Sequence, residues 1–381
     1  GTSVANLHQR RRSLISVIAP DRAGSPGTPV LLRYTGGAST LQASAFYSGG
    51  LELGNVRART EANIAFMFEQ FDPYWEKTTS SSATLTTQAS FTANYIAQRA
   101  ACGSWGAMGT GMNNPVLALT SGSDGTLYAG GQFTTAGGAV ASRIAQWSTA
   151  GVWSKVGNGF NNDCNDIVIH PNGTLYAVGA FTLASATNAS RVAQWSGTGW
   201  ANLGNAVNNT VNTATLSKIG DLFIGGTFTT ASGFSACRVA RWNVDRWRSV
   251  GAGVNDEVKK LVFDSASELY AIGTFTTASA TSACGIAKFN LTDWWRAVGS
   301  SGLRKAAGVG LGNAATVLSN GALIIGGNFD QADAVTASYI AQWNGVSYNS
   351  VSNHVNDDVE DIFPLYGGCL IVSGVFTRLG G

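Results

Sequence analysis

Short clusters of asparagine and acidic residues recur at nearly regular intervals along the chain. Carboxylate and carboxamide oxygens accept hydrogen bonds from sugar hydroxyls and coordinate cations, so such clusters are candidate ligand sites. The acidic members that we select as candidate ligand-binding residues are Asp163, Asp256, Asp357 and Asp358. Asparagine and aspartate also stabilise turns through their own side chains, and turn formation is the interpretation that the sequence favours.

Tryptophan also recurs, and its ring face is a platform on which a sugar ring can stack. The recurring residues are Trp153, Trp200, Trp247 and Trp294. An aromatic residue that returns at one position of a repeated unit is typical of the core between neighbouring units, and we expect this of these four. Trp295 and Tyr348 depart from the pattern. We therefore predict that these two are exposed and add them to the candidate ligand-binding residues.

The residues that catalysis or metal binding would need are not arranged for either. The three histidines, His8, His170 and His354, lie far apart, and the five cysteines have no metal-binding spacing. The glycine-rich stretch 308–312 lacks the strand-then-helix context of a nucleotide site, so we expect a plain flexible loop there. The sequence predicts no catalytic residue, no metal, no cofactor and no enzyme activity.

The composition argues against two classes of partner, nucleic acids and membranes. The chain has 24 basic and 22 acidic residues and a net charge of +2, without the clustered lysine and arginine of a nucleic-acid surface. No apolar run reaches the roughly 18 residues of a membrane span. We therefore expect neither a nucleic-acid partner nor membrane insertion. The odd, scattered set of five cysteines indicates folding in a reducing cytoplasm.

A repeat of about 47 residues is the strongest pattern in the sequence. One phenylalanine per unit returns at spacings of 48, 47, 47, 54 and 47 residues, at Phe133, Phe181, Phe228, Phe275, Phe329 and Phe376. The second unit contains four short strand patterns, at 166–170, 174–181, 190–195 and 199–204. Four strands per unit predict the blades of an all-β propeller. A glycine pair before the phenylalanine indicates close backbone approach.

The ends of the repeat give the number of blades. Five full units run from about 115 to 352, and residues 359–381 match only the first half of a unit. Residues 89–112 match a second half. The two halves would complete one another as a split blade, because each would cover the open edge of the other. This predicts six blades over 89–381, with seven as the alternative.

The repeat signatures, "GG-x-F-T" and "IAQW", resemble bacterial and phage propeller-like repeats related to the fungal cell-polarity marker Rax2 and to delta-60 repeats. This resemblance covers roughly residues 89–381. It implies the fold and little about function, since propellers host many functions.

Residues 1–80 have a different pattern. Ser3 precedes apolar residues at helical spacing that end at Pro20, and strand patterns follow at 30–36, 39–53 and 63–77. This order, with Gly50-Leu51-Glu52 and Asp72-Pro73-Tyr74-Trp75, resembles the last part of the ring domain of the distal tail protein of long-tailed phages. The family's first strands would lie before Gly1. We expect a small α+β or β-sandwich-like domain, joined to the propeller by a linker at 81–88.

The tail-protein resemblance implies an assembly role. In that family the domain builds a ring, often hexameric, at the end of the tail tube. The residues of this chain that we assign to such a contact are Arg10, Arg11, Arg12, Tyr74 and Trp75. The three arginines are also compatible with a solvated helix face.

The expected function combines the two parts. It is a virion structural protein of the distal tail or baseplate, made in the host cytoplasm, whose partners are the tube, hub and baseplate proteins and whose propeller is a scaffold or binds a host-surface glycan. The alternative is a bacterial surface propeller that binds polysaccharide. A glycan-degrading enzyme is the weaker alternative, because it would need two opposed carboxylates at one site.

Overall fold

The computed structural model describes residues 30–36, 39–45, 56–59, 65–67, 97–99, 105–205, 207–243, 245–290, 294–306, 308–351, 355–364 and 370–377. The chain divides into two compact units, Gly1–Thr87 and Gln88–Gly381. No helix lies among the described residues, and hence none there that could cross a membrane.

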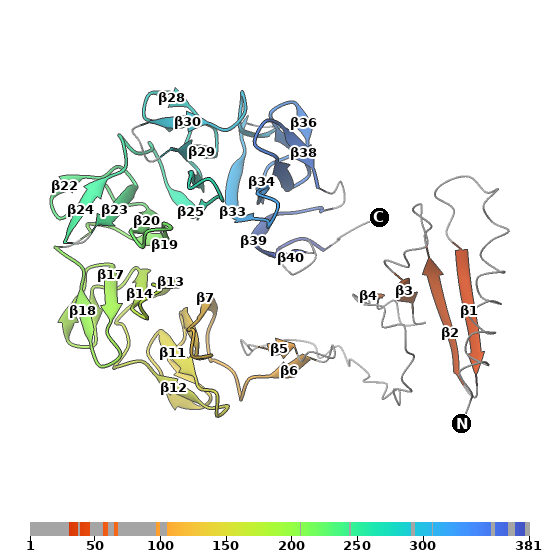
Figure 1. The fold of residues 1–381 in the computed structure, drawn as a ribbon, viewed down its shortest axis with the longest axis horizontal. Coiled ribbons are helices and arrows are strands. Elements are labelled where there is room, and N and C mark those ends of the chain that lie inside the picture. Colours follow the sequence, from red (N-terminus) through yellow and green to blue (C-terminus); the bar gives the residue numbers. More distant parts are fainter. Residues whose placement is uncertain are drawn as a thin grey trace. The chain divides into compact units, whose positions relative to one another are not determined.

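The described part of the first unit is one antiparallel sheet. Its strands follow in chain order, β1 (Val30–Gly36), β2 (Ser39–Ala45), β3 (Val56–Arg59) and β4 (Ala65–Met67), as Figure 1 shows. β1 coincides with the first predicted strand, whereas β3 lies in a stretch for which the sequence predicted none. The predicted helix after Ser3 and the candidate assembly residues Arg10, Arg11, Arg12, Tyr74 and Trp75 lie outside the described residues.

The second unit is an all-β propeller. Its described residues form five complete blades, each a four-stranded antiparallel sheet. The blades consist, in order, of β7 (Val116–Ser121), β8 (Leu127–Gly131), β11 (Ile144–Trp147) and β12 (Trp153–Lys155); β13 (Cys164–Ile169), β14 (Leu175–Gly179), β17 (Val192–Trp195) and β18 (Trp200–Asn202); β19 (Val211–Leu216), β20 (Leu222–Gly226), β23 (Val239–Asn243) and β24 (Arg246–Ser249); β25 (Val258–Phe263), β26 (Leu269–Gly273), β29 (Ile286–Phe289) and β30 (Trp295–Ala297); and β33 (Leu311–Val317), β34 (Leu323–Asn328), β37 (Ile340–Trp343) and β38 (Tyr348–Ser350). The first strands of successive blades contact one another on the inner side (Figure 1).

Each complete blade also carries a feature that the sequence did not predict. A hairpin of two two-residue strands follows the repeated phenylalanine and stands apart from the main sheet. These hairpins are β9–β10 (Thr135–Ala136, Ala139–Val140), β15–β16 (Leu183–Ala184, Thr187–Asn188), β21–β22 (Thr230–Ala231, Phe234–Ser235), β27–β28 (Thr277–Ala278, Thr281–Ser282) and β35–β36 (Gln331–Ala332, Val335–Thr336). Two residues are too few to show a period-two pattern, and these strands are not among the four that the sequence predicted for a unit.

The 54-residue spacing has a structural cause. Two additional strands, β31 (Leu303–Lys305) and β32 (Gly308–Val309), extend that hairpin to a four-stranded sheet, in which β31 pairs with β35 and β32 pairs with β31. The prediction that residues 308–312 form a flexible loop is therefore wrong, because this stretch supplies β32 and the start of β33.

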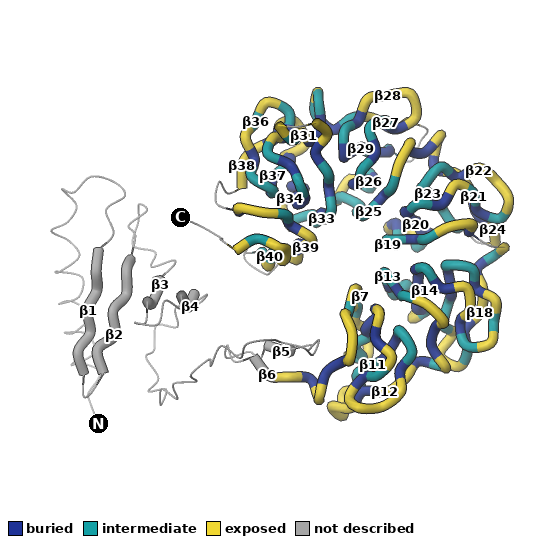
Figure 2. Tube along the Cα trace, turned by 180° about the vertical axis from the view of Figure 1, so that it is seen from behind, coloured by how far each residue is buried: buried dark blue, intermediate teal, exposed yellow. Residues whose placement is uncertain are grey.

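Aromatic side chains fill the space between blades. Phe133, Phe181, Phe228, Phe275 and Phe329 are fully buried, and Figure 2 shows buried segments along the strands with exposed segments at the connections. Burial of one such ring stabilises the fold by about 1.5–3 kcal/mol. The glycine pairs allow the predicted close approach. A Cβ on Gly130 would lie 2.8 Å from Cys164 Sγ of the next blade, and one on Gly131 would lie 2.2 Å from Pro115 O.

A hydrogen bond ties each complete blade to the residues before it. The outer-strand indole donates from Nε1 to a backbone carbonyl of the preceding unit, in Trp153 to Met108 (2.7 Å), Trp200 to Val156 (3.0 Å), Trp247 to Leu203 (2.8 Å) and Trp295 to Val250 (2.8 Å). In the fifth blade Tyr348 replaces tryptophan and donates to Val298 O at 2.9 Å.

The two terminal halves of the repeat are separate two-stranded sheets. One consists of β5 (Ala97–Arg99) and β6 (Trp105–Ala107), the other of β39 (Val359–Pro364) and β40 (Leu370–Gly374). Arg99 pairs with Trp105 as Trp147 pairs with Trp153, so the first half has the register of an outer pair. Leu119 of β7 is 51% exposed, whereas Ile167 at the same place in the next blade is 2% exposed. Joining of the halves stays a prediction.

The split blade can be tested with a pair of cysteines. In the first blade Tyr128 pairs with Gln146, and the repeat places Ile371 and Gln98 at the corresponding positions. We expect Ile371→Cys with Gln98→Cys to form a disulfide within one chain, detected by mass spectrometry of peptides, because directly opposed strand residues lie within disulfide reach. Phe363→Cys with Gln98→Cys is the control, since Phe363 lies on the strand beyond β40 and should not cross-link. A cross-link found only between chains would contradict closure within one chain.

Candidate functional site

The recurring asparagines have a structural role in the described blades. Asn161 Oδ1 accepts from the backbone N–H groups of Thr182 and Leu183, both at 2.9 Å, and its Nδ2 donates to Thr182 Oγ1 at 2.8 Å. The same arrangement holds for Asn113, Asn208 and Asn255. These side chains therefore hold the start of four of the five small hairpins, across 21 or 22 residues of sequence, rather than stabilising a turn of their own as the sequence favoured.

Two of the candidate acids accept a hydrogen bond from the backbone of the residue that follows them. Asp256 Oδ1 accepts from Glu257 N at 2.8 Å, and Asp357 Oδ1 accepts from Asp358 N at 2.9 Å. Both residues are exposed, whereas Asp358 is half-buried and its Oδ1 has no hydrogen-bond partner among the described residues. In the described part of the chain no three histidine, cysteine or acidic side chains meet in a metal-binding group. The four candidate acids therefore do not meet in a shared metal-binding group within that part.

The fourth candidate acid, Asp163, is neutralised within the protein. Its Oδ1 lies 3.4 Å from Arg143 Nε, an ion pair rather than a hydrogen bond, and its Oδ2 accepts from Gln132 Nε2 at 2.8 Å. The arginine and the aspartate side chains are 23% and 28% exposed. Asp163 thus joins the first and second blades rather than facing a ligand.

The structure corrects the predicted exposure of the aromatic candidates. Trp295 is 3% exposed and Tyr348 is 4% exposed, so the prediction that they are exposed is wrong. Both occupy the inter-blade position of the other tryptophans and donate to the preceding unit. Trp294, which we expected in the core, is 67% exposed. The pairing of Phe289 with Trp295, equivalent to that of Trp242 with Trp247, shows which of the two neighbours belongs to the core.

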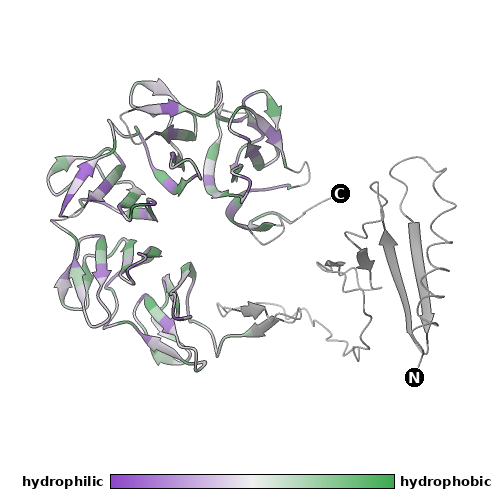
Figure 3. Cartoon of the chain, viewed as in Figure 1, coloured by the Kyte–Doolittle hydropathy of each residue, from purple (hydrophilic) through white to green (hydrophobic). Residues whose placement is uncertain are grey.

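The inner strands carry polar groups that brace neighbouring blades. Asn165 Nδ2 donates to Val211 O at 3.0 Å, and Asp166 Oδ2 accepts from Ala214 N at 2.9 Å. Burial raises the pKa of the Asp166 carboxyl above its usual value, while Lys260 acts in the opposite direction. β25, which contributes Lys260, shows hydrophilic residues in Figure 3. These groups already have partners in the fold and are not free for a ligand.

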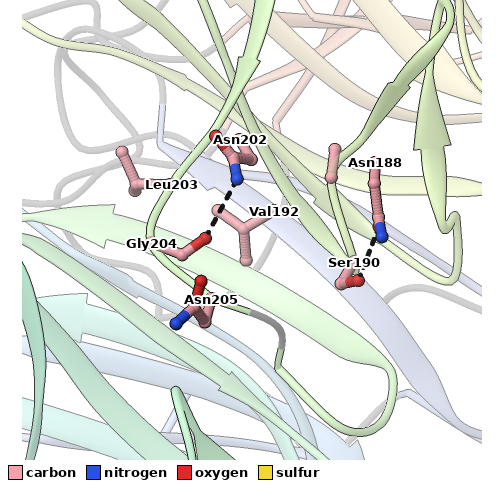
Figure 4. Close-up of a pocket in the computed structure, with 8 residues that line it drawn as sticks. Asn188, Ser190, Val192, Asn202, Leu203, Gly204 and Asn205 are labelled. Atoms are coloured by element: carbon pink, nitrogen blue, oxygen red, sulfur yellow. Dashed lines mark hydrogen bonds between the residues drawn. The ribbon is translucent and has the colours of Figure 1, made fainter.

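A small hollow in the second blade has unused polar groups. Its volume is about 270 Å³, just below the range of typical ligand pockets. Asn188 and Ser190 line one side, Asn202 and Asn205 line the other, and Val192 and Leu203 contribute apolar surface (Figure 4). Val192 and Leu203 are buried, so the hollow has an apolar floor beneath its polar rim.

Local hydrogen bonds position the polar rim. Ser190 Oγ donates to Asn188 Oδ1 at 2.9 Å, and Asn202 Nδ2 donates to Gly204 O at 3.3 Å. Ser232 Oγ accepts from Asn205 N at 3.0 Å and donates to Asn205 O at 2.8 Å, which holds that backbone in place. Within the described residues, Asn188 Nδ2, Asn202 Oδ1 and the Asn205 carboxamide have no partner. The rim therefore offers both donors and acceptors to a ligand.

Sequence reasoning missed this hollow because it looked for what the repeats share. Asn188 and Asn202 correspond to Val140 and Lys155 in the first blade and to Ser235 and Ser249 in the third. The usable signal is a carboxamide side chain that one unit has and its neighbours lack. The side chains of the rim hold no acid, base or thiol, so the arrangement can bind but has no group for proton transfer.

The blades and their inter-blade bonds define the second unit as a repeat-built β-propeller. No protein-family model and no curated protein matches the chain. Solved structures similar to it include the extracellular domain of BT4673 from B. thetaiotaomicron (TM-score 0.48, 9% identity, 94% of this chain and 38% of that one). Others are the WD40 propeller domain of Doa1 (0.46, 12%, 91% and 94%) and PorZ of Porphyromonas gingivalis (0.46, 13%, 87% and 48%). Such likeness concerns the fold alone.

The exchanged roles of the neighbouring tryptophans give a direct test. We expect Trp295→Phe to lower the free energy of unfolding by about 1–3 kcal/mol, because it leaves the buried Val250 carbonyl without a donor. Trp294→Phe should change it by less than about 0.5 kcal/mol, as usual for an exposed side chain. Urea unfolding followed by circular dichroism measures both. Equal losses in the two variants would contradict the assignment.

Proposed function

We propose that the propeller is a carbohydrate-binding scaffold and that the hollow at Asn188, Asn202 and Asn205 is its binding site. The carrying observation is the combination of three carboxamide side chains with an apolar floor in a hollow of about 270 Å³. This volume suits one small unit of a larger molecule better than a whole extended ligand.

The chemistry of the rim supports a sugar over other small ligands. A carboxamide has an acceptor oxygen and two donor hydrogens, so it can satisfy two neighbouring hydroxyl groups at once. Val192 and Leu203 are almost fully buried, so they shape the hollow and leave the carboxamides of its rim as the groups that would contact the sugar. A neutral rim of this kind would bind weakly, and strength would come from several sites engaged together.

The wider role rests on the sequence of residues 1–80. Their resemblance to the distal tail protein supports a virion structural protein in which the first unit assembles a ring, with six copies favoured, and the propeller carries the glycan site. A ring multiplies a weak site into an avid one if several copies reach the same surface. The alternative, a bacterial surface propeller that binds polysaccharide, uses the same hollow without a ring.

Sugar binding can be tested by removing the rim. We expect the full chain to bind at least one of glucose, galactose and N-acetylglucosamine at millimolar concentration in saturation-transfer NMR. Asn188→Ala with Asn202→Ala should weaken that binding about tenfold, since each lost hydrogen bond contributes about 0.5–1.5 kcal/mol. Asn349→Ala, an exposed asparagine on the outer strand of another blade, is the control and should bind normally. No binding of any of the three sugars would contradict the proposal.

The assembly role needs a separate measurement. We expect light scattering and particle imaging of the full chain to show a closed ring, and a variant with Tyr74→Ala and Trp75→Ala to remain monomeric. A monomer at high concentration would contradict the tail role and leave the surface propeller. Cleavage of any glycan by the purified chain would instead support the enzyme alternative.

A further inference from the structure

One arginine per blade lies at the same place in three consecutive blades. Arg143, Arg191 and Arg238 precede the third strand and have left-handed backbone angles, with φ of 66°, 78° and 68°. Each donates its backbone N–H to the carbonyl of the repeated phenylalanine of its blade, at 2.8 to 2.9 Å. Their side chains therefore leave the chain from equivalent positions, and the three blade junctions can be compared directly.

The junction between the first and second blades contains its own anion. Arg143 Nη1 is held by the carbonyl oxygens of Gln132 (3.0 Å) and Phe133 (3.3 Å). The Asp163 carboxylate of the second blade balances its charge at 3.4 Å, and Gln132 Nε2 fixes that carboxylate at 2.8 Å. This junction shows where a carboxylate sits when the arginine is paired.

The next junction has the same arginine without the anion. Arg191 Nη1 donates to Phe181 O at 3.3 Å, the same anchor as in the first blade. The positions of Gln132 and Asp163 are here Ala180 and Thr210, as the matching bonds from Ala180 N to Asp163 O and from Thr227 N to Thr210 O show. Among the described residues Arg191 forms no ion pair, whereas Arg143 does; the Nε atoms of both arginines lack a hydrogen-bond acceptor. The half-buried guanidinium of Arg191 thus faces Ala180 and Thr210, whose side chains are uncharged and shorter than those of Gln132 and Asp163.

The third junction keeps an acid. Glu257 occupies the position of Asp163 at the Arg238 junction, and its Oε1 accepts from Asn212 Nδ2 at 2.8 Å, without an ion pair to Arg238 among the described residues. Of the three arginine-bearing junctions, only that of Arg191 therefore combines the guanidinium with neutral residues at both facing positions.

We propose that Arg191 binds the carboxylate of an acidic sugar, which takes the place that Asp163 fills at the neighbouring junction. A guanidinium presents paired N–H donors that match a carboxylate, and such charge-assisted bonds are stronger than neutral ones. The proposal rests on the proposed carbohydrate binding and names its class, a uronic-acid-containing glycan. Arg191 does not itself line the carboxamide hollow, but its chain neighbours Ser190 and Val192 do, so a sugar is the ligand class that we test against an acidic peptide.

Calorimetry with the full chain tests this site. The probes are trigalacturonate and the neutral galactose trisaccharide of equal length. We expect trigalacturonate to bind at least tenfold more tightly than the neutral probe and to weaken as salt is raised, because screening weakens the ion pair. Arg191→Gln should remove at least tenfold of the trigalacturonate affinity. Arg143→Gln is the matched control and should stay within twofold, since Asp163 already occupies its guanidinium.

A second variant separates loss of binding from loss of folding. Ala180→Gln with Thr210→Asp recreates the first junction around Arg191 and should abolish trigalacturonate binding while keeping or raising the melting temperature. The proposal is overturned if Arg191→Gln leaves the affinity unchanged, if Arg143→Gln loses as much, or if triglutamate binds as tightly as trigalacturonate.

The two proposals fail in different ways. If the Asn188→Ala, Asn202→Ala variant loses neutral-sugar binding while Arg191→Gln retains trigalacturonate binding, the hollow stands and the Arg191 site is wrong. If Arg191→Gln alone loses trigalacturonate and the hollow variant binds all sugars normally, the Arg191 site stands and the hollow is wrong.

Discussion

The bond from an outer-strand aromatic residue to the carbonyl of the unit before it is the contact on which the propeller depends. In four blades the donor is an indole and in the fifth it is the hydroxyl of Tyr348, with donor–acceptor distances of 2.7 to 3.0 Å. A buried carbonyl deprived of its donor is costly, and the ring that supplies the donor also fills the space between sheets. One side chain thus both bonds to the preceding unit and packs between the two sheets, and the blades hold their surface residues in place through it.

The repeated features of this fold could be predicted, because residues that recur at a fixed spacing occupy equivalent buried positions in successive blades. The spacing of Phe133 and its counterparts located the blades, and the glycine pairs indicated the close approach at Gly130 and Gly131. The sequence prediction placed Trp294 in the core and Trp295 at the surface, and the structure has the reverse. Strand pairing, rather than position in the repeat, decides which of the two rings enters the core. The asparagine bonds span 21 residues in sequence, as in Asn161 to Thr182, and depend on a hairpin that no local pattern announces.

The candidate sites were harder to predict because they depart from the repeat. Asn188, Asn202 and Arg191 lie in the second blade or at its junction with the third. Each becomes a candidate only when it is compared with the residue at the equivalent position of the neighbouring blades. Asp163 illustrates the reverse case. Its type and spacing suggested a ligand site, but the fold pairs it with Arg143. In a repeat protein, comparison between units inside one chain therefore substitutes for comparison between proteins.

The strands β31 and β32 show how such a fold can grow. β31 pairs with β35 and β32 pairs with β31, outside the main sheet, and the fifth blade keeps its register, with Leu323 opposite Trp343 as Leu127 is opposite Trp147. The small hairpins consequently behave as insertion points at which length can change without disturbing the blade that bears them. A loop or a short domain can be added at these five hairpins, in evolution or by engineering, while the four-stranded sheets continue to stabilise the fold.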